Sequence, residues 1–157
     1  MSSPAADSGS IDWKLAAFDA MSLAEMYAVL QLRNAVFVVE QQCAFQDIDG
    51  ADGLAMHLLG RRDGRLQAYA RCFQAGIKFA EASIGRVVVC PQARGGGLGH
   101  ALIERAVRSV CELWGSQAIR IGAQSQLEKY YSGHGFVDAN RRYIEDGIDH
   151  LEMIWQP

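Results

Sequence analysis

The sequence predicts a single α/β domain with a mixed, mostly antiparallel, twisted sheet of about six to seven strands flanked by helices. Three features predict this class. Short β-prone runs alternate with long helical patterns, Asp-Gly pairs join some runs as hairpins, and other runs are connected through a helix, as parallel neighbours require. At 157 residues, the chain has the length of one domain with its own core. We expect residues 1–10 to be a disordered polar tail and residues 11–157 to be the domain.

The composition narrows the functional class. Half of the residues are apolar and the net charge is -3, whereas a nucleic-acid-binding surface needs a basic excess. No run approaches the ~20 apolar residues that span a bilayer, and the first residues lack a signal-peptide pattern. We therefore expect a cytoplasmic protein with no nucleic-acid or membrane partner. Four scattered cysteines form no CxxC pair, which predicts free thiols and no metal site.

The first elements are a strand and a helix. Residues 11–18, IDWKLAAF, predict the strand, and Ser22 with Glu25 forms the capping box of a helix over 22–35. We expect its core face to carry the apolar side chains at helical spacing, which are Leu23, Met26, Tyr27 and Leu30. The Asp- and Gly-rich residues 43–53 predict a loop.

Three strands are expected next. MHLLGRR (56–62) and RLQAYARCF (65–73) flank Asp63-Gly64, a dipeptide typical of a two-residue hairpin turn. ASIGRVVVC (82–90) is rich in β-branched residues and is followed by Pro91, which a central strand excludes.

A second long helix is expected from near Gly97 to Gly115, because glycine commonly ends helices. Its apolar stripe consists of Ile103, Ala106, Val107, Val110 and Trp114.

The remaining residues predict a strand, a short helix and a final hairpin. AIRIGA (118–123) is the strand, and SQLEKYYSGHG (125–135) is the short helix ending in glycine. FVDANRRYI (136–144) and IDHLEMIW (148–155) are strands joined by Glu145-Asp146-Gly147.

The stretch VVVCPQARGGGLGHAL, residues 87–102, places Arg94 and three glycines between a strand and a helix. The first N–H groups of a helix lack internal partners and attract anions. Glycines let a phosphate approach the backbone, and arginine adds charged donors. These properties favour a phosphate site over a plain turn. A dinucleotide fingerprint fails because His100 takes the last glycine position, and a P-loop fails because no lysine is present.

Arg94-x-x-Gly97-x-Gly99 after a valine-rich strand resembles the acyl-CoA pyrophosphate signature of the GNAT N-acetyltransferase superfamily. Five blocks resemble its ElaA-like branch: LQLRNAVFVVEQ, QDIDG, IGRVVV, GAQSQLEKYYSGHGF and YIEDGIDH. The predicted element order resembles this fold over nearly the whole chain. The resemblance implies a sheet splayed between its fourth and fifth strands. It also implies acetyl-CoA as cosubstrate and direct transfer of its acetyl group to a primary amine in a ternary complex.

The resemblance further implies a set of cofactor-binding residues. The fourth strand would hold the pantetheine arm through its backbone, the glycine-rich loop would hold the pyrophosphate, and the end of the fifth strand would add a contact. These residues are Val87, Val88, Val89, Arg94, Gly95, Gly96, Gly97, Leu98, Gly99 and Gln124. The wider superfamily often has asparagine where Gln124 stands, so Ser125 or Gln126 are alternatives for that contact.

Tyr131 matches the tyrosine that family enzymes carry four residues before a terminal Gly-Phe, and the resemblance implies that it is the general acid. Packing at a helix end is the alternative role. The general base is left open between bulk water and five side chains: Glu40, Asp47, His57, Glu81 and His150. No cysteine has an adjacent base, and Cys90, beside the loop, is the candidate for a covalent route.

The acceptor is expected to be a small-molecule or peptide amine. Glu40, Asp47, Asp49 and Asp52 fall in the connection that borders the acceptor side in this fold, and carboxylates attract cations. This favours the hypothesis of a cationic acceptor, with an acidic solvated loop as the alternative. Exposed strand edges are compatible with a homodimer. A catalytically silent CoA-binding sensor or interaction module is the alternative function, and a nucleotide-dependent dehydrogenase lacks its fingerprint.

Overall fold

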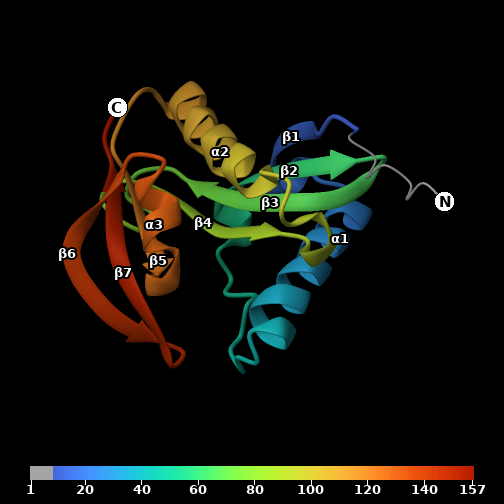
Figure 1. Cartoon of the computed structure of the whole chain (residues 1–157). Helices are drawn as coiled ribbons and strands as arrows, with labels where there is room; N and C mark the ends of the chain where they lie inside the picture. Colours follow the sequence, from blue (N-terminus) through green and yellow to red (C-terminus); the bar gives the residue numbers. More distant parts are fainter. Residues whose placement is uncertain (1–8) are drawn as a thin grey trace.

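The computed structural model describes residues 9–157, within which seven strands form one sheet in the order β1-β2-β3-β4-β5-β7-β6 (Figure 1). The strands are β1 (Asp12–Ala17), β2 (Met56–Arg62), β3 (Arg65–Phe73), β4 (Ala82–Val89), β5 (Ile119–Gln124), β6 (Phe136–Glu145) and β7 (Ile148–Trp155). The helices are α1 (Leu23–Arg33), α2 (Leu98–Trp114) and α3 (Glu128–Ser132). The predicted fold class is confirmed, because only β4 and β5 pair in parallel. The tail expected over residues 1–10 lies outside the described residues, apart from Gly9 and Ser10.

The parallel contact between β4 and β5 is short. Ala82 pairs with Ile119 and Ser83 pairs with Arg120, and the two strands then diverge. β4 continues to Val89 paired only with β3 on its other side, so its remaining backbone groups on the β5 side are free for other partners. The expected splay between the fourth and fifth strands is therefore confirmed, and Figure 1 shows the two parts of the sheet turning apart.

A β-bulge interrupts β4 within this splayed part. Tyr69 pairs with Val88 and Arg71 pairs with Gly85, so both Arg86 and Val87 lie opposite a single residue of β3. Arg86 takes a left-handed backbone conformation with φ 49°. Such a bulge changes the direction in which the following backbone groups point.

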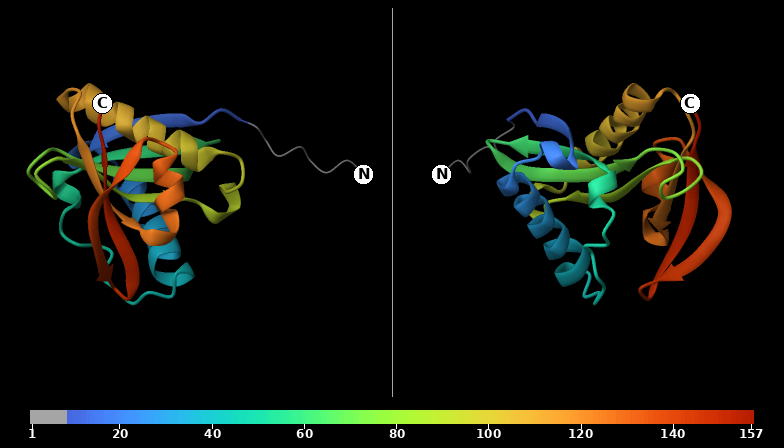
Figure 2. Two further views of the ribbon diagram at one scale, coloured as in Figure 1. Left: turned by 60° about the vertical axis from the view of Figure 1, so that its left-hand side comes forward. Right: turned by 180° about the vertical axis from the view of Figure 1, so that it is seen from behind.

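The sheet separates two hydrophobic cores, with α1 and α2 on opposite faces (Figure 2). Ala68, Ala70 and Cys72 of β3 pack in the core that includes α2. Tyr69 of the same strand packs with Val29 and other residues of α1. Because β3 is covered on both faces, consecutive residues 68–73 of this strand are all buried.

The predicted core face of α1 is wrong in part, although Met26 does pack against the core. Leu23 is 92% exposed and Tyr27 is 74% exposed, whereas Val29, Leu32 and Arg33 are buried. The spacing of apolar residues could not reveal that a buried, ion-paired arginine lies on the face toward the sheet. The helix also continues beyond the predicted end as a π-helical segment, η2 (Asn34–Glu40).

The turn and cap predictions agree with the structure. Asp63-Gly64 and Asp146-Gly147 have positive φ at both residues, as the predicted hairpin turns require. Gly97 is the N-cap of α2 and Gly115 is its C-cap. Among residues 9–157, no helix combines the length and the apolar composition needed to cross a membrane.

Candidate functional site

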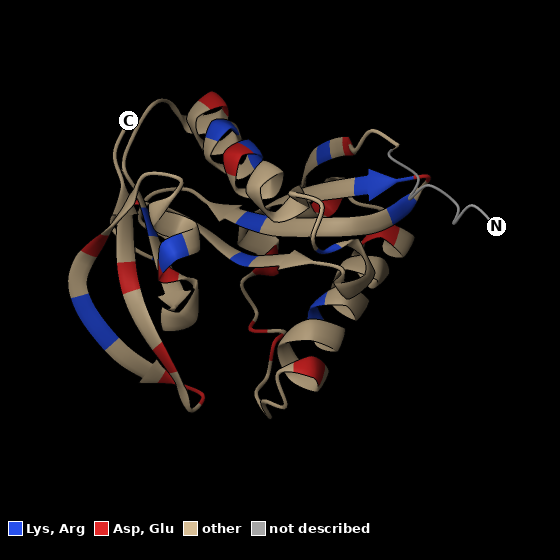
Figure 3. Ribbon diagram, viewed as in Figure 1, with Lys and Arg blue, Asp and Glu red and all other residues tan. Residues whose placement is uncertain are grey.

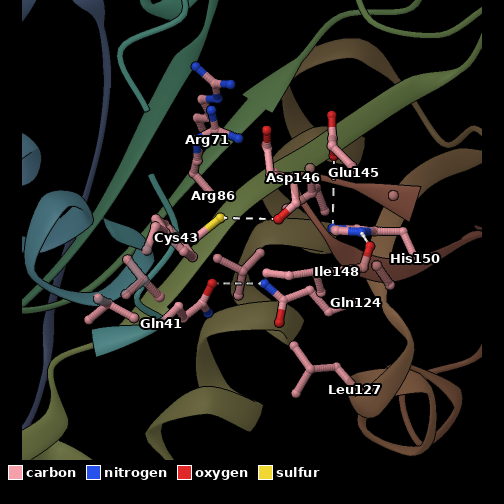
Figure 4. Close-up of a pocket in the computed structure, with 18 of the residues that line it drawn as sticks. Gln41, Cys43, Arg71, Arg86, Gln124, Leu127, Glu145, Asp146, Ile148 and His150 are labelled. Atoms are coloured by element: carbon pink, nitrogen blue, oxygen red, sulfur yellow. Dashed lines mark hydrogen bonds and ion pairs between the residues drawn. The ribbon is translucent and has the colours of Figure 1, made fainter. Parts of the chain in front are cut away.

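A cleft of about 760 Å³ lies where the sheet splays. Its walls come from η2 and the loop after it, from β3, β4 and β5, from Tyr131 of α3, and from the β6–β7 hairpin. Figure 4 shows Gln41 and Cys43 facing Gln124 and Asp146 across this space. We name the two parts after the roles expected from the sequence. The cofactor half is formed by β4, Arg94 and the start of α2. The acceptor half is formed by residues 41–54 with the buried Arg33 that binds them, by Arg71, Lys78 and Arg86, and by the β6–β7 hairpin.

The structure brings six of the predicted site residues together along the cleft. They are Val87, Val88, Val89, Arg94, Gln124 and Tyr131. Gly95, Gly96 and Gly97 follow Arg94 in an exposed loop that leads into α2, outside the cleft itself. The side chain of Leu98 is buried in the core beside α2, so Leu98 has only backbone groups to offer to a ligand.

The N-terminus of α2 is open. Gly95 and Gly97 have φ of 91° and 80°, values that favour glycine. Gly97 caps the helix without any side-chain hydrogen bond, which leaves the first N–H groups available. A Cβ placed on Gly95, Gly96 or Gly97 would meet no atom within 4 Å. No other part of the described chain therefore covers the loop backbone on the side where these Cβ atoms would lie.

Arg94 forms an exposed ion pair with Glu40 at the end of η2. Its Nη2 lies 2.8 Å from Glu40 Oε1, and the two side chains are 45% and 42% exposed. Exposed pairs contribute little to stability, so the guanidinium can exchange this carboxylate for another anion at small cost.

Tyr131 is buried against aromatic side chains while it still lines the cleft. Tyr130 and Phe136 contact it edge-on, with ring centroids 4.8 and 5.7 Å away. Burial raises the pKa of Tyr131, which keeps the phenol protonated at neutral pH. The Tyr130 hydroxyl instead donates to the carbonyl of Gly99 and ties α3 to the start of α2.

Two hydrogen bonds connect the walls of the cleft (Figure 4). Gln124 Nε2 donates to Gln41 Oε1 at 3.2 Å, and the Cys43 thiol donates to the carbonyl of Asp146 at 3.4 Å. Gln126, the alternative to Gln124, donates to Gln124 Oε1 and also lines the cleft.

The acidic loop of the acceptor half is neutralised by arginines. Arg33 Nε lies 2.9 Å from Asp47 and its Nη1 lies 2.7 Å from Asp52, while Arg71 binds both Asp49 and Asp52. The bond from Arg71 holds the pKa of Asp49 far below its usual range, against the opposing effect of burial. Asp47, Asp49 and Asp52 are therefore paired within the protein, so they do not support the expectation of a cationic acceptor.

Acidic residues also lie at the β6–β7 turn. Figure 3 shows them at the tip of this hairpin and around the end of η2. Glu145 and Asp146 belong to the tip and line the cleft; Glu145 has no Lys or Arg partner among the described residues, and His150 Nε2 lies 3.8 Å from it.

The structure separates the five candidate bases. His57 is fully buried between the Tyr69 hydroxyl and the carbonyl of Asp52. Glu81 pairs with Arg120, and Asp47 pairs with Arg33. None of these three lines the cleft, whereas Glu40 and His150 do.

Several cleft residues were missed in the sequence. Arg71 and Arg86 lie within predicted strands, and Glu145 and Asp146 lie in a predicted turn. A charged residue inside the apolar run RLQAYARCF was the available signal for Arg71. Cys90 lies outside the cleft lining, and its thiol donates to Gln92. Among the described residues, no three His, Cys, Asp or Glu side chains are grouped to hold a metal ion.

Comparisons with known proteins agree with this architecture. Residues 23–157 match the family model described as an acetyltransferase (GNAT) domain. ElaA of Escherichia coli is 39% identical, with 91% of this chain and 95% of that protein covered. A crystal structure of an acyl-CoA N-acyltransferase from Pseudomonas aeruginosa has a TM-score of 0.88 at 42% identity, covering 93% of this chain and 99% of that one. The crystal structure of Escherichia coli ElaA has a TM-score of 0.86 at 37% identity, covering 93% and 99%. The resemblance to the ElaA-like branch is confirmed.

Proposed function

Because the chain belongs to the GNAT acetyltransferase family, we propose that it is an N-acetyltransferase that uses acetyl-CoA and a primary amine. The observation that carries this proposal is the splay of β4 from β5. A cleft of about 760 Å³ lies at the splay, and the open N-terminus of α2 lies beside it. One continuous surface thus offers backbone groups to a long, phosphate-bearing ligand.

The cofactor half would bind acetyl-CoA chiefly through its backbone. The first N–H groups of α2 and the loop at Gly95, Gly96 and Gly97 would bind the diphosphate, where the helix dipole favours negative charge. Arg94 would leave Glu40 and add a charge-assisted bond. The free edge of β4 at Val87, Val88 and Val89 would hold the pantetheine arm.

Tyr131 would give its proton to the departing thiolate. A general acid must be protonated before the step, and burial keeps this phenol in that form. The amine would attack the thioester directly. Cys90, beside the cofactor loop, lies outside the cleft lining and would not take the acetyl group, and the thiol of Cys43, which does line the cleft, donates to the carbonyl of Asp146.

The test replaces Tyr131 with phenylalanine in an acetylation assay. We expect Tyr131→Phe to lower kcat by about 100-fold or more, the usual contribution of a general acid, while calorimetry shows unchanged acetyl-CoA affinity. Tyr130→Phe is the matched control and should keep most of the turnover. Binding of acetyl-CoA without acetylation of any primary amine by the wild type would favour a silent CoA-binding module instead.

A further inference from the structure

The acceptor half of the cleft has two sides of opposite charge. One side carries Arg71, Lys78 and Arg86, and the other carries Glu145 and Asp146 of the β6–β7 tip. Both sides line the same space, into which the sheet splay opens.

The basic side holds more positive than negative charge. Four cationic side chains, Arg33, Arg71, Lys78 and Arg86, pair with only three carboxylates, Asp47, Asp49 and Asp52. One positive charge is left without a carboxylate, and the Arg71 Nε is buried without a hydrogen-bond partner.

Asp49 is the carboxylate that these cations share. It lies 2.5 Å from Arg71, 3.4 Å from Lys78 and 3.6 Å from Arg86. Arg86 and Lys78 are partly exposed at the cleft, so a further anion can reach them. Under-compensated cations in a cleft favour an anionic ligand group.

The acidic side also carries His150, and the contacts of its ring show which nitrogen carries the hydrogen and which keeps a lone pair. His150 Nδ1 lies 2.7 Å from the carbonyl of Ile148, and a carbonyl only accepts, so Nδ1 carries the hydrogen. The neutral ring therefore keeps the lone pair of Nε2, which lies 3.8 Å from Glu145.

The position of this imidazole is fixed by its neighbours. Tyr143 stacks on it with centroids 5.3 Å apart and planes 21° apart. Gly122 of β5 leaves room for the Tyr143 hydroxyl, because a Cβ at residue 122 would collide with that oxygen. His150 also pairs with Gln124 across β5 and β7, so the ring lies beside the end of the splayed strand.

We propose that the acceptor is a primary amine that also carries an anionic group such as a carboxylate or phosphate. Arg86, Lys78 and Arg71 bind the anionic group, and His150 with Glu145 receives the amine. This inference rests on the proposed acetyltransferase function and specifies its acceptor.

The proton transfers balance. His150 Nε2 takes one proton from the ammonium, and Glu145 stabilises the imidazolium that forms. The amine nitrogen bonds to the thioester carbon, and the bond from that carbon to sulfur breaks. The second amine proton passes to solvent as the amide forms, Tyr131 protonates the thiolate, and Tyr131 then regains a proton from solvent. The products are the N-acetyl compound and CoA, with one proton released through His150.

The test compares three matched probe amines with acetyl-CoA: β-alanine, propylamine and 1,3-diaminopropane, together with their homologues of four and five carbons. We expect kcat/KM to be at least about tenfold higher for the best anionic amine than for the neutral or cationic amine of the same length, the effect of one charge-assisted bond.

Variants separate the two ends of the site. Arg86→Gln should raise KM for the anionic amines at least about tenfold more than for propylamine, and Lys78→Gln removes a more exposed cation if Arg86→Gln fails to fold. Arg108→Gln, on the exposed face of α2, is the matched control and should change nothing. His150→Gln keeps a donor for the Ile148 carbonyl and should lower kcat/KM for every amine alike, with acetyl-CoA affinity unchanged in calorimetry.

Equal rates for the three classes, or a preference for the diamines, would overturn the inference and leave the acetyltransferase function intact. Absence of acetylation of all the amines would instead contradict the proposed function itself.

Discussion

The two halves of the cleft are built by different means. In the cofactor half, the free edge of β4 and the open start of α2 offer backbone groups, and Arg94 is held only by an exposed ion pair. In the acceptor half, buried side chains from separate segments depend on one another, as Arg33, Asp47 and Asp52 do. Changes in the first half should therefore affect ligand binding, whereas changes in the second should also affect folding.

The largest expected effect is on stability in the acceptor half. Arg33→Met removes a fully buried cation that binds Asp47 and Asp52. Leaving buried carboxylates without this partner should cost about 3–5 kcal/mol in urea unfolding.

Lys14→Met is the control for this change, because Lys14 pairs with Glu25 at the surface and should cost less than about 1 kcal/mol. Equal losses in the two variants would show that the network beneath the acceptor half adds no special stability.

The next effect is on affinity in the cofactor half. Arg94→Gln should weaken acetyl-CoA binding about 10- to 100-fold in calorimetry, since a hydrogen bond to a charged group contributes about 1.5–3 kcal/mol. Its unfolding free energy should not change, because the pair with Glu40 is exposed. Glu40→Gln frees the guanidinium and should bind acetyl-CoA as tightly as the wild type or more tightly. Unchanged affinity in Arg94→Gln would remove this residue from the cofactor site.

A pH dependence of stability should come from His57, which lies beneath the acceptor half and contacts the carbonyl of Asp52. Burial lowers the pKa of His57, so the folded chain keeps the ring neutral while the unfolded chain protonates it near pH 6.5. The unfolded chain then binds more protons, and stability falls as pH drops below about 6.5, with a slope that approaches 1.4 kcal/mol per pH unit.

Urea unfolding at pH 7.5, 6.5 and 5.5 measures this slope, and His57→Gln should flatten it. The same slope in both proteins would mean that His57 titrates alike in the folded and unfolded chains.

The smallest effect concerns one backbone position of the cofactor loop. Gly97 has φ 80°, a conformation that costs an alanine roughly 1–2 kcal/mol, so Gly97→Ala should lower the unfolding free energy by about 1 kcal/mol. Gly96→Ala is the control, because its φ lies outside the left-handed region and no atom lies within 4 Å of the added Cβ. A larger loss for Gly96→Ala than for Gly97→Ala would contradict the conformational role of Gly97.

The sequence predicted the cofactor half well because local chemistry determines it. The glycine caps of α2 and the valine-rich β4 are each encoded by neighbouring residues, as are the Asp-Gly turns elsewhere in the sheet. The order of elements followed from the same signals, including both hairpins. Homodimerisation and the roles of individual site residues stay predictions.

The acceptor half could not be read in the same way. Arg33 lies in a helix, Asp47 lies in a loop, Asp52 begins a short 3-10 helix, and Arg71 and Arg86 lie in two strands, so only the fold brings them together. The spacing of apolar residues in α1 predicted that Leu23 and Tyr27 face the core. That prediction assumed that Arg33 lies at the surface, whereas it is buried. The carboxylates could be noticed in the sequence, but the sequence does not show which arginines pair with them in the folded chain.

The most direct test of the account is the mapping of amide chemical shifts by NMR when coenzyme A is added. We expect the largest changes at the amides of residues 87–89 and 95–100, with much smaller changes at the β6–β7 tip. Changes confined to the acceptor half, or none at residues 95–100 under saturating coenzyme A, would contradict the claim that the backbone of the cofactor half binds the diphosphate.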